Sequence, residues 1–136
     1  MREIEFRGKR VDTGEWVYGA FVPDALETPD NDLITWGFIR RYNRDIGKME
    51  TIEVARESVG QYAGLRDKNG KKIFEGDIVR DKKGRHLEVF WKEIGTGGWW
   101  FCYNQDGDRY HVDAIHLDYL EVIGNIHDSP SLLEVE

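Results

Sequence analysis

Apolar and polar residues alternate over short stretches of the chain, and this period of two predicts β-strands rather than helices. In the first half the predicted strands are residues 4–7, 16–22, 33–39 and 51–54. The first two form a hairpin around turn residues 12–15. Pro23 is predicted to close the second strand, and a polar loop over residues 24–32 follows it. Residues 40–50, which contain Asn43 and Gly47, suit an exposed hairpin tip.

The second half repeats this pattern, with predicted strands at residues 61–65, 71–74, 78–80, 86–91, 99–103 and 120–125. Asn69-Gly70 is the strongest turn signal, because this dipeptide accepts positive φ angles readily. Residues 99–103 are apolar on both faces of their predicted strand, so we expect that strand to be buried. Short helical turns are predicted near residues 56–59 and 131–134, and a short helix or strand near residues 113–117.

About ten short strands with glycine-rich turns indicate a mainly β protein, either a β-sandwich or a small barrel with a second sheet. The turns at Gly70, Gly84 and Gly98 have the spacing of an SH3-like barrel in the C-terminal half, packed with an N-terminal β-sheet. We therefore predict an N-terminal β subdomain over residues 1–58, an SH3-like β-barrel subdomain over 59–126 and a tail with a helical turn over 127–136. A single domain is the alternative division.

Composition is that of a soluble folded protein: 136 residues are 40% hydrophobic and include five Trp, six Tyr and six Phe. The single cysteine, Cys102, excludes an internal disulfide and a cysteine-rich zinc site, which is typical of a reducing cytoplasm. No apolar stretch approaches the roughly 18 to 20 residues of a membrane span, so we expect no membrane association.

The net charge of −7 is unevenly distributed. Residues 104–136 contain one basic residue, Arg109, against eight acidic residues, whereas the rest of the chain is balanced. This distribution does not favour a binder of duplex DNA, which normally presents a basic face. The basic clusters near residues 7–10, 40–44 and 80–85 are interpreted as solvated turn and edge charges.

Two segments carry a resemblance to a known family. Residues 61–79, QYAGLRDKNGKKIFEGDIV, resemble the signature QYTGLKDKNGKEIYEGDIV of the YopX family of phage and prophage proteins. Residues 122–133, VIGNIHDSPSLL, are similar to that family's closing VIGNIYENPELL, and residues 4–10 and 14–19 are similar to its start. The resemblance implies a mostly β, oligomeric protein in the cytosol of a bacterial host, encoded by a phage or prophage, and it implies no catalytic activity.

The central motif also has a structural interpretation. Gly64, Gly70 and Gly76 are predicted to mark turns, and residues 75–77 to fix a turn through side-chain to backbone hydrogen bonds. The predicted core residues of the motif are Tyr62, Leu65, Ile73, Phe74, Ile78 and Val79.

No set of residues predicts catalysis, a metal site or a cofactor. Cys102 lies among aromatic residues, where its thiol would be inert even beside His86, His111 or His116. Asn104, Asp106 and Asp108 alternate like a calcium loop but lack its glycine and its final glutamate. The spacing of His111, Asp113 and His116 matches no zinc motif. We therefore expect that the protein is not an enzyme.

The aromatic residues offer the one candidate surface. Trp36 and Trp99, flanked by Arg40, Arg41 or Arg85, are the candidate binding residues; Phe38, Trp91, Trp100, Tyr103 and Tyr110 could extend the surface. If these aromatics are exposed, a protein partner or a homo-oligomer is the first hypothesis, because Trp and Tyr anchor protein interfaces. The alternative is a small β-barrel that stacks single-stranded nucleic acid on its aromatic rings.

Overall fold

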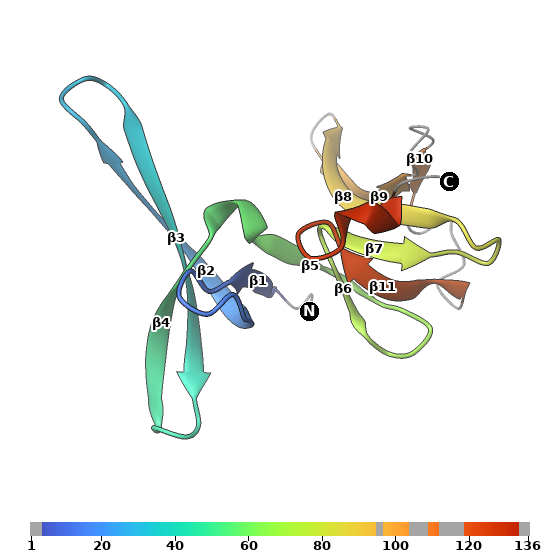
Figure 1. The fold of residues 1–136 in the computed structure, drawn as a ribbon, viewed down its shortest axis with the longest axis horizontal. Coiled ribbons are helices and arrows are strands. Elements are labelled where there is room, and N and C mark those ends of the chain that lie inside the picture. The colour runs from blue at the N-terminus through green and yellow to red at the C-terminus, as the bar shows by residue number, and fades with distance from the viewer. Residues whose placement is uncertain (1–3, 95–96, 104–108, 112–118, 134–136) are drawn as a thin grey trace. The chain divides into compact units, whose positions relative to one another are not determined.

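The computed structural model describes residues 4–94, 97–103, 109–111 and 119–133, with side chains over 4–91 and 119–133. The protein is mainly β, as the alternation predicts, and its strands form two antiparallel sheets. The chain divides into two units, Met1–Gln61 and Tyr62–Glu136 (Figure 1). The division into segments 1–58, 59–126 and 127–136 stays a prediction.

The first unit is a curled antiparallel sheet. Its strands are β1 (Phe6–Lys9), β2 (Trp16–Glu27), β3 (Leu33–Asn43) and β4 (Lys48–Val54), hydrogen-bonded in the order β4-β3-β2-β1. The first residues of β5 (Gly60–Arg66) continue the sheet beyond β1, where Gln61 pairs with Phe6. The predicted hairpin of the first two strands and the predicted return of the fourth are confirmed.

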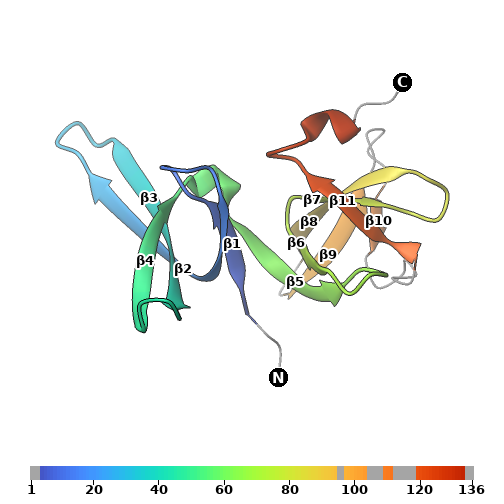
Figure 2. The same ribbon diagram turned by 60° about the horizontal axis from the view of Figure 1, so that its bottom comes forward.

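Hydrogen bonds join the end of β4 to the end of β1 and so close one end of this sheet. The Ala55 N–H donates to the Lys9 carbonyl at 2.8 Å, and Arg10 forms a β-bridge with Val54. The short 3-10 helix η1 (Arg56–Ser58) follows, at the predicted helical turn, and the Ser58 hydroxyl accepts the Lys9 N–H. In Figure 2, η1 is the green helix that connects the end of β4 to β5.

The curl encloses the hydrophobic core of the first unit on one face of the sheet. Four side chains are buried there, and Phe6, Phe21 and Val59 pack against them; the buried four are Val17, Ile39, Ile52 and Val54. Gly8 belongs to the same face, and a Cβ at this position would lie 2.8 Å from a Val54 methyl. Close approach of β1 to β4 therefore requires glycine at position 8.

The prediction that Pro23 closes the second strand is wrong. Strand β2 continues through Pro23 to Glu27 and stays in register with β3 throughout. Strand β1 pairs with β2 only as far as Gly19, so Pro23 lies on an edge where its missing N–H removes no bond between strands. The loop between β2 and β3 is therefore residues 28–32, shorter than the predicted loop over 24–32. Within it the Thr28 N–H donates to the Asp32 carbonyl at 2.8 Å.

Strands β2 and β3 consequently extend beyond the rest of their sheet. Strand β4 pairs with β3 only from Gly37 to Asn43, so neither β1 nor β4 flanks residues 22–36. We call residues 22–36 the distal hairpin, which is the blue and cyan ribbon leading away from β1 and β4 in Figure 1.

The second unit is built around a five-stranded antiparallel sheet of order β10-β9-β8-β7-β11. Its strands are β7 (Asp77–Arg80), β8 (His86–Ile94), β9 (Gly97–Tyr103), β10 (Arg109–His111) and β11 (Glu121–Asn125). The rest of β5 pairs with β6 (Lys72–Phe74), and the 3-10 helix η4 (Pro130–Leu133) lies near the predicted C-terminal turn.

The SH3-like barrel is not confirmed, because the sheet has two open ends within the described part of the chain. Strand β9 confirms the predicted strand at residues 99–103. The predicted burial of its side chains and the predicted element near residues 113–117 lie outside the described residues.

The structural interpretation of the central motif is confirmed except for Gly64, which does not mark a turn but lies within β5, where the register with β6 shifts. Gly64, Gly70 and Gly76 have φ angles of 81°, 81° and 89°, in the left-handed region that favours glycine. The core of this unit contains Ala63, Ile73, Val79, Leu87, Val89 and Leu120, with Leu65 packed against it. Tyr62, Phe74 and Ile78 are also buried. The Asp77 carboxylate accepts the Phe74 N–H at 2.7 Å, so residues 75–77 do fix their turn.

One buried carboxylate joins the two segments that carry the family resemblance. Asp67 is 7% exposed, and its Oδ1 accepts the N–H groups of Asn69 and Lys71 at 2.9 Å. Its Oδ2 accepts the Val122 N–H, also at 2.9 Å. The turn after β5 is thereby fixed to β11, the red strand beside β7 in Figure 2.

We predict that Asp67→Ala lowers the free energy of unfolding by about 3 kcal/mol, because three backbone donors lose their charged acceptor. Urea denaturation followed by circular dichroism measures this change, and hydrogen exchange at the Val122 amide should accelerate with it. The control is Asp45→Ala, which removes an exposed carboxylate and should change stability by less than about 0.5 kcal/mol. Equal stability of the two variants would contradict the role given to Asp67.

Candidate functional site

The register of the first unit defines which side chains share a face. Directly opposite residues of antiparallel strands point to the same side of the sheet, and successive residues point to opposite sides. Ile39 and Ile52 are paired and buried, so they mark the inner face. We call the following residues of the opposite side the outer face: Tyr18, Ala20, Val22, Asp24 and Leu26 of β2, Ile34, Trp36, Phe38, Arg40 and Tyr42 of β3, and Met49, Thr51 and Glu53 of β4. Trp16 of β2 and Arg7 and Lys9 of β1 lie on the same side of the sheet, next to Tyr18.

The outer face is mostly apolar and exposed. Leu26 is 56% exposed, Ile34 44% and Tyr42 58%. Tyr18, Val22 and Met49 are exposed as well, and Trp36 and Phe38 are half-buried. A sheet with its core on one side normally presents polar side chains on the other. An exposed apolar surface of this kind is characteristic of an interaction site.

The charged groups of the outer face are few and of both signs. On β3, Arg40 donates from its guanidinium to the Thr51 hydroxyl at 3.0 Å, a bond that leaves its charge uncompensated. On β2, Asp24 accepts the N–H of Ala25 at 2.8 Å. Glu53 lies on β4, opposite Phe38. The outer face is therefore not a basic surface.

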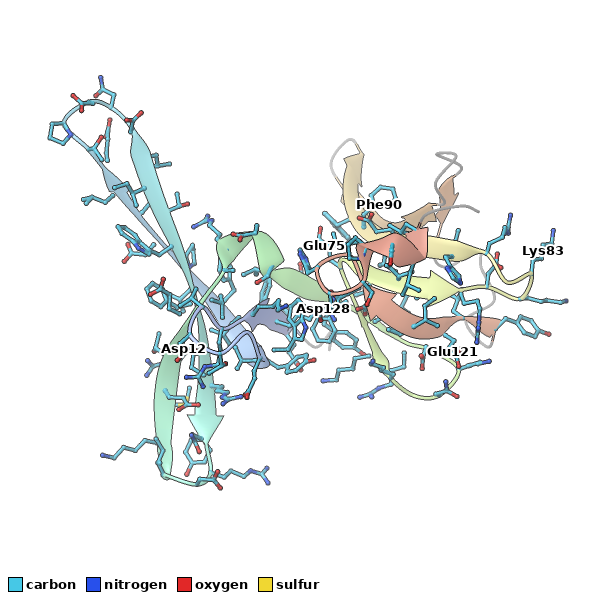
Figure 3. All side chains as sticks on the ribbon, in the orientation of Figure 1. Asp12, Glu75, Lys83, Phe90, Glu121 and Asp128 are labelled. Atoms are coloured by element: carbon cyan, nitrogen blue, oxygen red, sulfur yellow. The ribbon has the colours of Figure 1, made fainter. Side chains whose placement is uncertain are left out.

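Arg56 of η1 holds the base of the distal hairpin. Its guanidinium donates to the Trp36 carbonyl at 2.9 Å and lies 5.8 Å from the centre of the Phe21 ring. Beyond this point no core covers the inner face: residues 22–27 and 33–35 are exposed on both faces of the hairpin. Figure 3 shows side chains standing out on both sides of this ribbon.

The structure brings together two of the predicted binding residues. Trp36 and Arg40 lie on the outer face of β3 with Phe38 between them. Arg41 points to the inner side, where its Nε is 2.8 Å from a carboxylate oxygen of Glu50. Asn43 also donates to Glu50 at 3.1 Å, and this bond together with Arg41 lowers the pKa of the Glu50 carboxyl. Arg41 is therefore paired within the sheet, away from Trp36.

The other two predicted residues belong to the second unit. Arg85 lies at the turn before β8, with its Nε 2.7 Å from an oxygen of Asp81. The side chain of Trp99 lies outside the described residues. Among the four candidates whose side chains the structure describes, only Trp36 and Arg40 thus form a common surface.

Sequence reasoning missed several residues of the outer face. It places Val22 at a strand end and Leu26 in a loop, because Pro23 predicts a stop between them. The sequence around Tyr18 and Met49 does not indicate on which side of the sheet the hydrophobic core lies. The sequence signal that could have identified the residues of β2 is the recurrence of apolar residues at even-numbered positions both before and after Pro23.

The described side chains give no support to a metal site or a catalytic site. Within the ranges that carry described side chains, no three His, Cys, Asp or Glu residues gather as metal ligands. The side chains of Cys102, Asn104, Asp106, Asp108, His111, Asp113 and His116 lie outside those ranges. His86 Nδ1 is 2.6 Å from the Leu132 carbonyl, which gives this residue a structural contact to η4. None of the described helical segments has the length and hydropathy of a membrane span.

Comparisons with known proteins place nearly the whole chain in a family. The family model described as YopX protein matches residues 5–134. Among solved structures, the chain is similar to protein EF1440 from Enterococcus faecalis, with 25% sequence identity and a TM-score of 0.46. That match covers 98% of this chain and 100% of the other. No curated protein matches the chain.

The pairing of Arg85 with Asp81 leads to a prediction about pH. Burial raises the pKa of the Asp81 carboxyl, but hydrogen bonds from the backbone and side chain of Arg85 outweigh it and lower that pKa below its ordinary 3.8. The fold thus favours the charged form. Its stabilisation is present above pH 3.8 and disappears as the pH falls through the lower, folded-state pKa.

We therefore expect Asp81→Asn to lower the free energy of unfolding by about 1 to 2 kcal/mol at pH 7. The difference from the unmodified protein should shrink as the pH falls below 3.8. Urea denaturation of both proteins over a series of pH values measures it. A difference that stays constant down to pH values well below 3.8 would contradict a charged Asp81 in the fold.

Proposed function

The chain belongs to the YopX protein family, and from this premise we propose that it is a non-enzymatic protein that binds another protein chain through its outer face. The observation that carries the proposal is the row of exposed apolar side chains along β2 and β3, where a one-sided sheet would be polar. Trp36 and Tyr42 in this row are of the residue types that anchor protein interfaces.

Charge favours this function over the binding of single-stranded nucleic acid. Over β2, β3 and β4 the outer face carries one basic group, Arg40, against the carboxylates of Asp24 and Glu53. On β1 the same side of the sheet carries Arg7 and Lys9, and both cations lie over the Trp16 ring. Arg41 and Arg85, the other arginines among the predicted binding residues, are each paired with a carboxylate. A surface that follows a phosphate backbone needs unpaired basic groups in excess. The stacked-base alternative therefore lacks the charge that would support it.

The setting proposed for this activity follows from the family resemblance. The segments over residues 61–79 and 122–133 resemble phage and prophage proteins, so we propose a phage or prophage origin and a place in the cytosol of the bacterial host. The lone Cys102 is compatible with that reducing compartment. An absence of enzymatic activity is proposed because no residue pattern in the sequence resembles a catalytic set.

We predict that Ile34→Lys weakens association of the protein with itself or with a host protein. A lysine at this position of the apolar surface must lose hydration on contact, which should weaken binding at least tenfold, or by about 1.4 kcal/mol. Light scattering measures self-association, and capture from a bacterial lysate on immobilised protein measures other partners. Circular dichroism checks that the fold is unchanged.

The matched control is Ile46→Lys, which makes the same change at an isoleucine 56% exposed in the turn between β3 and β4. It lies outside the outer face and should leave association unchanged. If the two variants behave alike, or if the unmodified protein is a strict monomer that captures nothing, the outer face is not a binding surface.

A further inference from the structure

We propose that the occupant of the outer face is the outer face of a second copy of this chain, across a two-fold axis over the Val22–Phe38 pair. This inference rests on the proposed function and names its partner. Three features of the first unit carry it: the uncovered distal hairpin, the symmetric order of apolar residues along β2 and β3, and the positions of Asp24 and Arg40.

The distal hairpin needs cover from outside its own unit. It consists of two strands that no other described strand of the unit flanks, and its residues 22–27 and 33–35 are exposed on both faces. An isolated two-stranded hairpin is at best marginally stable in water. Packing its apolar side against another sheet removes that instability, as in a two-layer β structure.

The order of residues along the outer face is symmetric about the Val22–Phe38 pair. On β2, Tyr18 and Leu26 lie four residues to either side of Val22. On β3, Ile34 and Tyr42 lie four residues to either side of Phe38. A two-fold axis across the strands at this pair sets each position against its mirror position on the second copy. Exposed apolar residues then meet exposed apolar residues at both ends.

The same operation brings opposite charges together. Arg40 and Trp36 lie two residues to either side of Phe38, so the guanidinium of one copy faces the Trp36 ring of the other. Asp24 is paired directly opposite Trp36 on the neighbouring strand, which places its carboxylate within reach of the same guanidinium. The contact forms twice, because each copy supplies one Arg40 and one Asp24.

Glu53 is the exception to this complementarity. It is paired with Phe38, so the axis sets it against Glu53 of the second copy. Its side chain is exposed on β4, beyond the two strands that carry the apolar residues, and water screens this like-charge contact. A partner of different sequence would not require this symmetry of apolar and charged positions, whereas a second copy does.

Charge reversal on the full-length chain tests the pairing. Arg40→Glu places a new carboxylate beside Asp24 of the second copy, and Asp24→Lys places a new ammonium group beside Arg40, so each variant alone meets like charges. We expect each to raise the dimer dissociation constant at least tenfold, or about 1.4 kcal/mol. An equimolar mixture of the two variants should dimerise again, because both of its contacts join opposite charges. The double variant should dimerise as well.

Light scattering over a range of concentrations gives the masses. The unmodified protein and the mixture should approach twice 15.9 kDa, and each single variant should stay near 15.9 kDa at the same concentration. The controls are Arg44→Glu and Asp45→Lys, exposed charges in the turn between β3 and β4. They change the net charge equally and should leave the dimer intact.

Failure of the pairing is distinguishable from failure of the proposed function. A monomeric unmodified protein, or single variants that dimerise normally, would overturn the pairing. If capture of a lysate protein then still depends on Ile34, the outer face binds a different chain and the proposed function stands. If neither association nor capture depends on Ile34, both are overturned.

Discussion

The hydrogen bond between Ala55 and Lys9 closes one end of the first sheet, and the rest of that unit depends on it. Because β4 is brought back to β1, the core side chains gather on the inner face, where Val17, Ile39 and Val54 are buried. Among its described residues, this unit has no further element that covers the outer face. An apolar outer face on such a sheet is therefore exposed unless a surface from outside the unit packs on it.

The second unit fixes its own turns internally. Buried carboxylates do this, Asp67 between β5 and β11 and Asp77 at the start of β7. Both belong to the motif over residues 61–79 that resembles the YopX signature, and that motif acts in the described structure as a framework. The most family-like segment thus explains the fold, while the proposed interaction surface lies on β2 and β3, mostly outside it.

Local patterns in the sequence predicted most strands, because alternation and Asn-Gly or Gly-Asp turns are local properties. They did not predict the length of β2, since the tolerance of Pro23 depends on β1 ending its pairing at Gly19. They also did not separate Arg40 from Arg41, whose neighbouring positions point to opposite faces. Which face is buried is decided by the joining of β1 to β4, a contact between residues far apart in sequence.

Hydrogen exchange of the distal hairpin at low and high protein concentration tests most directly whether a second copy covers the outer face. The hairpin alone is marginal, so its amides over residues 22–27 and 33–36 should exchange quickly in a dilute monomer and more slowly as dimer forms. Amides of Val79 and Leu87 in the second unit's core should not respond to concentration. Exchange in the hairpin that is equally fast at every concentration would contradict the pairing.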